Sequence, residues 1–207
     1  KGVSREDKQL PKILSIGEKV MEHARFENLN KNIYRFCDNV LEKKDGYNAI
    51  KDFINRDIPK IKGIKKGEKI IKTEKYDDEI PKIILNLQNS YLYLQGPPGS
   101  GKTYQSANAI IELLKNNKKV AVTANSHKVI HNLLERVENL ANKQKYVFKG
   151  LKMGNPDNED TFYDGNLIKT DKNEKHYIDG LKDNKILLYA GTKYHLSQWY
   201  YQNKLDY

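Results

Sequence analysis

The residues from Gly96 to Thr103 have the types and spacing of a phosphate-binding loop. They read Gly-Pro-Pro-Gly-Ser-Gly-Lys-Thr, which fits the pattern G-x-x-x-x-G-K-[ST]. Glycines in such a loop let backbone N–H groups turn inward around a polyphosphate, because glycine readily adopts the backbone angles required. Lys102 places a positive charge beside the terminal phosphates, and the hydroxyl of Thr103 is the expected ligand of Mg²⁺. The pattern predicts a site for a nucleoside triphosphate with magnesium.

Two elements must hold this loop in place. Residues 91–95 (Tyr-Leu-Tyr-Leu-Gln) are an apolar and aromatic run that predicts a short strand directly before the loop. Between 102 and 116 the apolar residues recur at helical spacing, which predicts a helix whose N-terminal dipole faces the phosphates. A plain Gly/Pro turn is the alternative, but the order strand, loop, helix favours the phosphate site. The predicted cofactor-binding residues, of which Lys102 and Thr103 are also predicted to be catalytic, are Gln95, Gly96, Pro97, Pro98, Gly99, Ser100, Gly101, Lys102, Thr103 and Tyr104.

A second polar segment follows the next predicted strand. Residues 120–124 are an apolar run typical of a buried strand, and residues 126–141 have helical spacing. Where the strand passes into the helix, hydroxyls and free N–H groups suit contacts to phosphates. An ordinary helix cap at Ser126 is the alternative. The side chains at this junction are Thr123, Asn125, Ser126 and His127.

The C-terminal third continues the alternation of strands and helices. Apolar runs predict strands at 146–149 and 186–190, and a helix is expected over 193–203. The polar stretch 150–184 is interpreted as a loop or small excursion. This alternation implies an α/β fold with a mainly parallel sheet and right-handed crossovers.

Helical patterns precede the phosphate loop. Residues 30–44 carry apolar side chains on one helical face, where Cys37 is interpreted as a small core residue. A shorter helix is expected around 49–54, and a further helix begins at a cap on Asp78. Between them, residues 59–75 are rich in lysine, glycine and isoleucine and form either a basic connector or a small hairpin.

Composition sets the broad class. The chain has 207 residues, a net charge of +10 and a mean hydropathy of −0.82, with one cysteine and no apolar run long enough to span a membrane. It has neither an initiator methionine nor a secretory signal, so we expect a cytoplasmic protein and a piece of a longer chain. The basic charge suggests nucleic acid as partner, although a genome that favours lysine codons would give the same composition.

The order of these motifs resembles that of superfamily 1 helicases. The phosphate loop, the segment 122–134 (Val-Thr-Ala-Asn-Ser-His-Lys-Val-Ile-His-Asn-Leu-Leu) and residues 190–192 (Ala-Gly-Thr) take the places of motifs I and Ia and of a third, DNA-contacting motif. The similarity is to the class, called B, of the nonsense-mediated-decay and Okazaki-fragment-processing helicases. Within it, Ser-His-Lys-x-Ile-x-Asn-Leu-Leu is similar to bacterial proteins that fuse a RecB-like nuclease to such a helicase. The resemblance covers about 91–134 and 185–196.

This resemblance implies an ATP-dependent helicase built on RecA-like P-loop NTPase domains. The loop would hold ATP·Mg²⁺ with Thr103 on the metal, and hydrolysis between two such domains would ratchet single-stranded nucleic acid, with DNA favoured over RNA. A second RecA-like domain is therefore an expected partner, and no membrane is. A contact from His127 would strengthen below about pH 6.5, where imidazole gains charge. The nucleic-acid-binding residues so implied are Thr123, Asn125, Ser126, His127 and Thr192.

The chain departs from the family pattern at its end. The acidic Asp-Glu-Ala motif is missing, because the chain stops at 204–207, where the strand leading to it would begin. We therefore expect residues 1–75 to be a helical accessory segment with a basic connector, and 76–207 a first RecA-like ATPase domain that is incomplete and inactive when isolated. The alternatives are an AAA-type or other P-loop ATPase, and a nucleotide-dependent nucleic-acid-binding module without catalysis.

Overall fold

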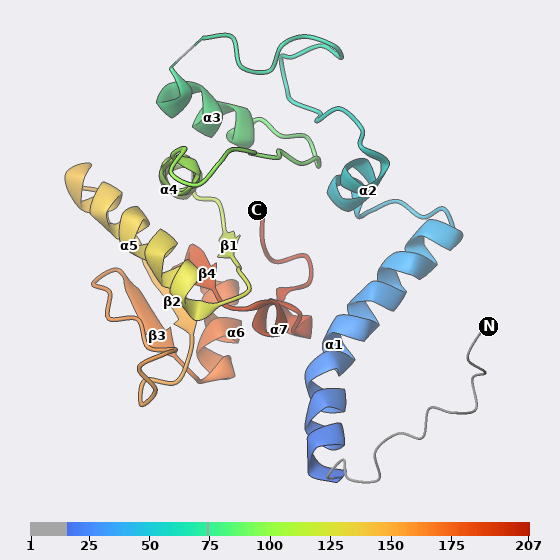
Figure 1. Ribbon diagram of the computed structural model, residues 1–207, viewed down its shortest axis with the longest axis vertical. Coiled ribbons are helices and arrows are strands. Elements are labelled where there is room, and N and C mark those ends of the chain that lie inside the picture. The colour runs from blue at the N-terminus through green and yellow to red at the C-terminus, as the bar shows by residue number, and fades with distance from the viewer. Residues whose placement is uncertain (1–15, 74) are drawn as a thin grey trace, which may run out of the picture.

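A computed structural model describes residues 16–73 and 75–207 (Figure 1). The first 15 residues of the expected accessory segment lie outside this range. In chain order the elements are α1 (Ile16–Leu41), α2 (Asn48–Asn55), α3 (Tyr76–Leu85), α4 (Lys102–Lys115), β1 (Val120–Val122), α5 (His127–Lys143), β2 (Gly150–Met153), β3 (Ile168–Asp171), α6 (Glu174–Asp183), β4 (Leu188–Ala190), α7 (Lys193–Leu196) and the 3₁₀-helix η2 (Trp199–Tyr201).

The described strands form one parallel sheet in the order β1-β4-β2-β3. The chain crosses from β1 to β2 through α5 and returns from β3 to β4 through α6. Because right-handed crossovers in opposite directions put their helices on opposite faces, α5 and α6 cover the two sides of the sheet (Figure 1). The predicted α/β class, with a parallel sheet preceded by helices, is confirmed.

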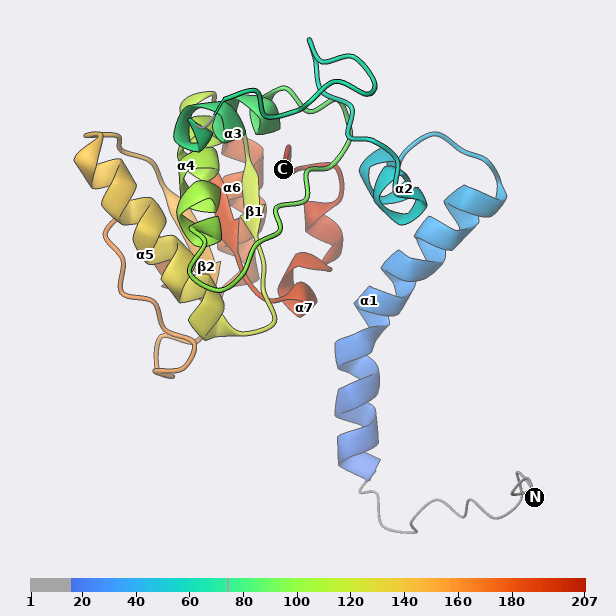
Figure 2. The ribbon, with the colours of Figure 1, turned by 45° about the horizontal axis from the view of Figure 1, so that its top comes forward.

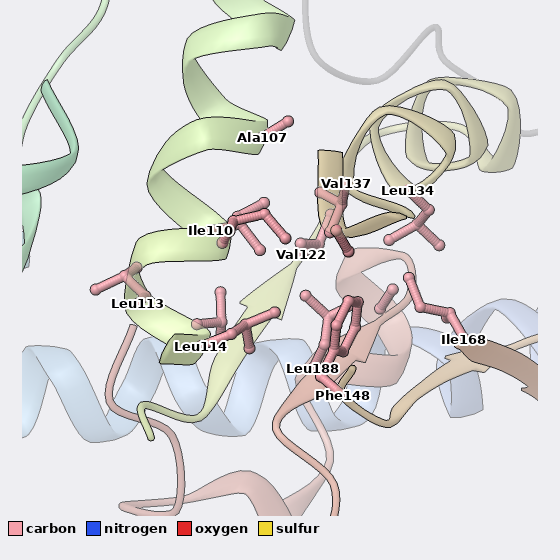
Figure 3. Packing of buried hydrophobic residues seen from close by; sticks show 14 of the residues in the cluster. Ala107, Ile110, Leu113, Leu114, Val122, Leu134, Val137, Phe148, Ile168 and Leu188 are labelled. Carbon is pink, nitrogen blue, oxygen red and sulfur yellow. The ribbon is translucent and has the colours of Figure 1, made fainter. Parts of the chain in front are cut away.

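The core has two parts, one on each face of the sheet. In β4, Leu188 and Ala190 face the side of α4 and α5, while Tyr189 faces α6, as the two-residue period of a strand requires. Figure 3 shows the larger cluster, in which Ile110 and Leu114 of α4 meet Val122, Leu134, Val137 and Leu188. Burial of these side chains fixes α4, and with it the phosphate loop that precedes α4, against the sheet.

The strand predicted at 91–95 is not formed. This segment is irregular, and Tyr93 is 65 % exposed. The outer edge of β1 is instead bonded to the C-terminal residues, since the Ala121 N–H donates to the Tyr207 carbonyl (2.8 Å) and the Asp206 N–H to the Lys119 carbonyl (2.9 Å). Apolar and aromatic composition favours a strand, but a strand also requires a hydrogen-bonding partner, which 91–95 lacks among the described residues.

The strand predicted at 146–149 begins four residues later, as β2, and the stretch 150–184 contains β2, β3 and α6 rather than a loop. Gly150 and Lys152 make β2 look polar. A Cβ on Gly150 would lie 2.9 Å from Cγ1 of Ile168, so the glycine permits close approach of β3. Lys152 is fully buried. Neither residue signals a strand by its own preference, which is why the sequence pattern missed it.

Helix boundaries differ in smaller ways. The helix expected at 126–141 is α5, and Ser126 caps it by accepting the Val129 N–H at 3.4 Å. The helix expected over 193–203 is divided into α7 and η2. Asp78 lies in the first turn of α3 rather than at its cap, where an acidic side chain still favours the helix dipole. Residues 59–73 form turns and a single bridge between Ile61 and Leu87. They are therefore a connector and not a hairpin.

The prediction of a buried apolar face on residues 30–44 is wrong. In α1, Cys37 is exposed, and Ile33 and Leu41 are 57 % and 79 % exposed. The helix meets α7 through its polar edge instead: the Asn32 amide donates to the Ser197 carbonyl at 2.9 Å, and Arg35 donates to Gln202 at 2.7 Å. No helix within residues 16–73 and 75–207 is long and apolar enough to cross a membrane.

Candidate functional site

The glycines of the phosphate loop adopt conformations that other residues avoid. Gly99 and Gly101 have φ of 80° and 82°, in the left-handed region. A Cβ on Gly96 would lie 2.4 Å from the Ser100 Oγ, so a glycine is also needed there for close approach. Gly101 immediately precedes α4, and the first N–H groups of that helix have no partner within the helix. The loop therefore ends on a helix N-terminus suited to an anion.

Lys102 folds back over the same loop. Its ammonium donates to the carbonyls of Gly96 (2.6 Å) and Pro97 (2.7 Å) and lies 3.4 Å from the Ser100 hydroxyl. All three partners are uncharged, so phosphate oxygens would be stronger acceptors for this cation. The hydroxyl of Thr103, next in the chain, is exposed at the first turn of α4.

A pocket of about 370 Å³ opens beside Lys102. The phosphate loop forms one wall, while Ile71, Tyr76 and Ile80 from the connector and α3 form the other. Gln105 also lines it: its amide nitrogen donates to the Asp77 carboxylate at 2.5 Å, and its amide oxygen is buried without a partner among the described groups. The pocket thus offers apolar walls and a neighbouring phosphate loop.

The predicted contacts at the strand ends are brought together. Val122 of β1 is paired with Ala190 of β4, and the Gly191 N–H donates to the Val122 carbonyl at 3.0 Å. Thr123 and Thr192 therefore follow neighbouring strands at the same edge of the sheet. In Figure 2 the loop before α4 curls beneath that helix at the end where α5 also begins. Open α/β sheets bind their ligands at this edge.

The individual side chains at this edge differ in exposure. Thr123 and Asn125 are exposed and, among the described residues, have no side-chain hydrogen bond, whereas Ser126 is engaged as the cap of α5. Thr192 is half-buried at the N-cap of α7. His127 is half-buried, and its Nδ1 has no partner among the described groups.

His127 belongs to a buried polar cluster that the sequence did not reveal. Its ring lies 6.2 Å from that of His131, and Lys152 donates to the Thr161 carbonyl beside them. Burial and the Lys152 ammonium both lower the pKa values of His127 and His131. Burial also lowers the pKa of Lys152 to about 8. Because the pKa of His127 is lowered, a contact that depends on its charge would strengthen at a lower pH than the ordinary imidazole value implies.

Thr192 is positioned by a second buried histidine. His195, 7 % exposed, bonds to the Tyr201 hydroxyl, and burial lowers its pKa to about 4. A Cβ on Gly191 would lie 2.6 Å from Cδ2 of His195, so the imidazole packs directly on the backbone before Thr192. The neutral ring supports the strand end rather than contacting solvent.

The predicted set is only partly assembled into one site. Gln95, Gly96, Pro97, Ser100 and Lys102 line the pocket, whereas Pro98, Gly99, Gly101, Thr103 and Tyr104 do not. Tyr76 and Gln105 were missed. Only Gln105 could have been found from the sequence, because it follows the phosphate-loop motif by two residues. Tyr76 comes near the pocket only through the packing of α3 on α4.

Comparison with known protein families identifies the family of the chain. The sequence model of the family described as "Type III restriction enzyme, res subunit" matches residues 38–198. This range contains the phosphate loop, the beginning of α5 and Thr192. No curated protein matches the chain.

Proposed function

Because the chain belongs to the family of type III restriction enzyme res subunits, a family of helicase-like ATP-binding domains, we propose that it is the ATP-binding motor domain of a helicase that translocates on single-stranded nucleic acid. Membership confirms the predicted RecA-like P-loop domain. It supports ATP-dependent chemistry with a divalent metal in general. The phosphate loop, with Lys102 held over it, is the observation that carries the proposal.

The residues present fit ATP·Mg²⁺. Phosphate oxygens would replace the Gly96 and Pro97 carbonyls as acceptors of the Lys102 ammonium, and Thr103 would hold the metal. The metal would neutralise charge that develops on the transferred phosphoryl group. The pocket between Tyr76 and the loop is where we propose that the base lies, with Gln105 in its lining.

The sheet edge offers the path for the strand. Thr123 and Asn125 present free polar groups, and Thr192 lies on the neighbouring strand. Such contacts reach the sugar–phosphate backbone and are tolerant of sequence. We propose DNA over RNA, an association with a second RecA-like domain, and a division between an accessory segment (1–75) and the motor (76–207).

The superfamily is proposed from motif order alone. The phosphate loop, the α5 start and Thr192 follow in the order of superfamily 1, class B. The family match names a restriction-enzyme subunit and does not extend to the nuclease–helicase fusions. The family match disfavours the AAA-type alternative. The following experiment addresses the other alternative, nucleotide-dependent binding without catalysis.

The sheet edge is tested with Thr123→Ala combined with Asn125→Ala. Both side chains are exposed and unbonded among the described residues, so the fold should be retained. We expect at least a fivefold loss of affinity for a labelled single strand in fluorescence anisotropy, because two backbone contacts are removed. Binding of an ATP analogue should be unchanged, since neither residue lies in the phosphate loop.

The matched control is Asn139→Ala combined with Asn142→Ala, two exposed positions nearer the other end of α5. Equal losses in both double variants would place the strand elsewhere. Strand binding that is the same with and without an ATP analogue would argue against a motor and equally against a nucleotide-dependent binding module.

A further inference from the structure

Residues 60–73, here called the basic loop, are held in a defined shape outside α3 (Figure 2). They contain six lysines and one glutamate. The Ile64 N–H donates to the Ile61 carbonyl (3.1 Å) and the Glu68 N–H to the Lys65 carbonyl (3.0 Å). With positive φ at the third residue of each, these are two successive type II β-turns.

Each turn presents a lysine at its corner. The third positions are Gly63 and Gly67, with φ of 84° and 90°, and the second positions are Lys62 and Lys66. The Lys-Gly pair therefore recurs at a spacing of four residues. The second residue of a type II turn lies at the outside of the bend, and both lysines are exposed.

The loop is clamped at both ends. At its start Ile61 is buried, the Lys62 N–H donates to the Asn86 carbonyl (2.9 Å), and Lys60 pairs with the buried Asp52 (2.8 Å). At its other end the Glu79 carboxylate accepts the N–H groups of Lys72 (2.9 Å) and Thr73 (3.3 Å). These bonds limit how far the lysines can move apart.

Four of the lysines have no counter-charge. Within residues 16–73 and 75–207 no carboxylate lies within 4 Å of the ammonium groups of Lys62, Lys65, Lys66 or Lys69, while Glu68 is paired with Lys72 at 3.7 Å. Like charges held close together repel one another, and a bound polyanion removes this repulsion. Four of the six lysines in the loop thus have no ion-pair partner among the described residues.

We propose that the basic loop is a second nucleic-acid contact, which binds the phosphodiester backbone at a place separate from the strand-end edge. The inference rests on the proposed function, since it supposes that nucleic acid is the substrate. None of the large apolar side chains of the loop is strongly exposed. A protein interface has apolar anchors at its centre, whereas a phosphate backbone needs only cations, so the composition favours nucleic acid over an acidic protein.

The test replaces Lys62, Lys65, Lys66 and Lys69 together by Gln in the 207-residue chain. The control replaces four exposed lysines that lie outside both surfaces, also by Gln: Lys143, Lys149, Lys175 and Lys182. Both variants lower the net charge by the same amount. Anisotropy is measured with a labelled single strand, with a duplex of the same sequence and with labelled poly-glutamate, at two salt concentrations.

We expect the loop variant to lose at least tenfold in affinity for a nucleic acid, with the slope of log affinity against log salt reduced by about 3, because each lost phosphate contact contributes about 0.7 to 0.9. The control should lose less than threefold. A greater effect on duplex or on single strand identifies the form that is bound. Melting temperatures check that both variants fold.

Four outcomes overturn the inference. Equal losses in the loop and control variants would mean that only overall charge matters. A matching loss of poly-glutamate binding would indicate an acidic protein as partner. Strand binding that is lost with Thr123→Ala, Asn125→Ala and kept in the loop variant would leave the proposed function intact and remove the second contact. No binding by the unaltered chain would contradict the proposed function as well.

Discussion

Lys102 is the residue on which nucleotide binding most depends. Its ammonium bonds to two loop carbonyls, so it holds the loop together and carries the charge that a polyphosphate requires. We expect Lys102→Ala to weaken binding of Mg·ATP at least tenfold, about 1.4 kcal/mol, because the phosphate charge then has no side-chain cation in the loop. Isothermal calorimetry measures the change directly.

The loss must be separated from a general effect of the lowered net charge. Lys115, at the other end of α4, is exposed, and Lys115→Ala serves as control. Equal affinities of wild type and Lys102→Ala for Mg·ATP would show that the phosphate loop is not the nucleotide-binding site. A similar loss in Lys115→Ala would show an effect of net charge only.

His195 makes stability depend on pH. Burial lowers its pKa to about 4 in the folded chain, against about 6.5 when unfolded. Between these values the unfolded chain binds a proton that the folded chain does not, so the free energy of unfolding is highest above about pH 6.5 and falls as the pH drops. The hydrogen-bonding neighbours of the ring are the hydroxyls of Tyr200 and Tyr201, and none of its described contacts is a carboxylate that would favour the charged form.

Urea titration at pH 7 and pH 5 measures this contribution. The wild type should lose about 2 kcal/mol more between the two pH values than His195→Phe, which has no proton to gain. Comparing the change in free energy of unfolding between the two proteins separates the effect of His195 from that of His127 and His131. The lowered pKa values of these two histidines act in the same direction in both proteins. Parallel pH profiles would show that the ring is not kept neutral.

At the scale of elements, Glu138 joins α5 to the start of β3. The side chain is 8 % exposed, and one carboxylate oxygen accepts the N–H groups of Leu167 (2.7 Å) and Ile168 (2.8 Å). The other accepts the Tyr163 hydroxyl at 3.0 Å. The carboxylate thus satisfies buried donors at the point where the excursion after β2 returns to the sheet, which is why a short, polar strand forms there.

Glu138→Ala should lower the free energy of unfolding by at least 2 kcal/mol, because it leaves two backbone donors unsatisfied at about 1 to 3 kcal/mol each. Glu138→Gln should lose less than half of that, since its amide oxygen can still accept both. Hydrogen exchange at Leu167 and Ile168 should accelerate in the alanine variant. Glu135→Ala, at an exposed position of the same helix, is the control. A loss of equal size in this variant would show that the bonds of Glu138 to Leu167 and Ile168 do not stabilise the fold.

At the scale of the whole molecule, the parallel sheet decides which distant segments meet. β1 and β4 lie side by side although α5, β2, β3 and α6 separate them in the chain. Thr123 and Thr192 consequently lie at one edge, the end at which Figure 2 shows the loop before α4. A nucleotide and a nucleic-acid strand bound there would lie against the same sheet. A structural change around the phosphates could then reach the nucleic acid over a short distance.

Helix α1 is placed by polar and aromatic contacts along one of its edges. Asn28 bonds to Gln198 at 3.0 Å, and the rings of Phe26 and Tyr194 meet edge to face at 5.6 Å. The apolar face of α1 points away from these contacts and is exposed. A pattern of apolar residues shows that a helix is amphipathic, but not which of its faces meets the rest of the fold.

The elements around the phosphate loop follow from residues that are near one another in the chain. Spacing alone gave the phosphate loop, α4, the α5 cap at Ser126 and the alternation that leads to a parallel sheet, because these depend on backbone angles and on helical and strand periods within a few residues. The segment 91–95 shows where such local prediction fails. Its composition favours a strand, but among the described residues no neighbouring strand pairs with it.

The tertiary structure alone decided what lies beside these elements. Buried Lys152 and close-packed Gly150 form a strand that their residue types disfavour, because the neighbours of β2 supply hydrogen bonds and close packing that no local preference encodes. In the same way Tyr76 reaches the pocket beside Lys102 through the packing of α3 on α4. Such contacts join residues far apart in the chain, and their free energy depends on the whole packed arrangement rather than on any stretch of sequence.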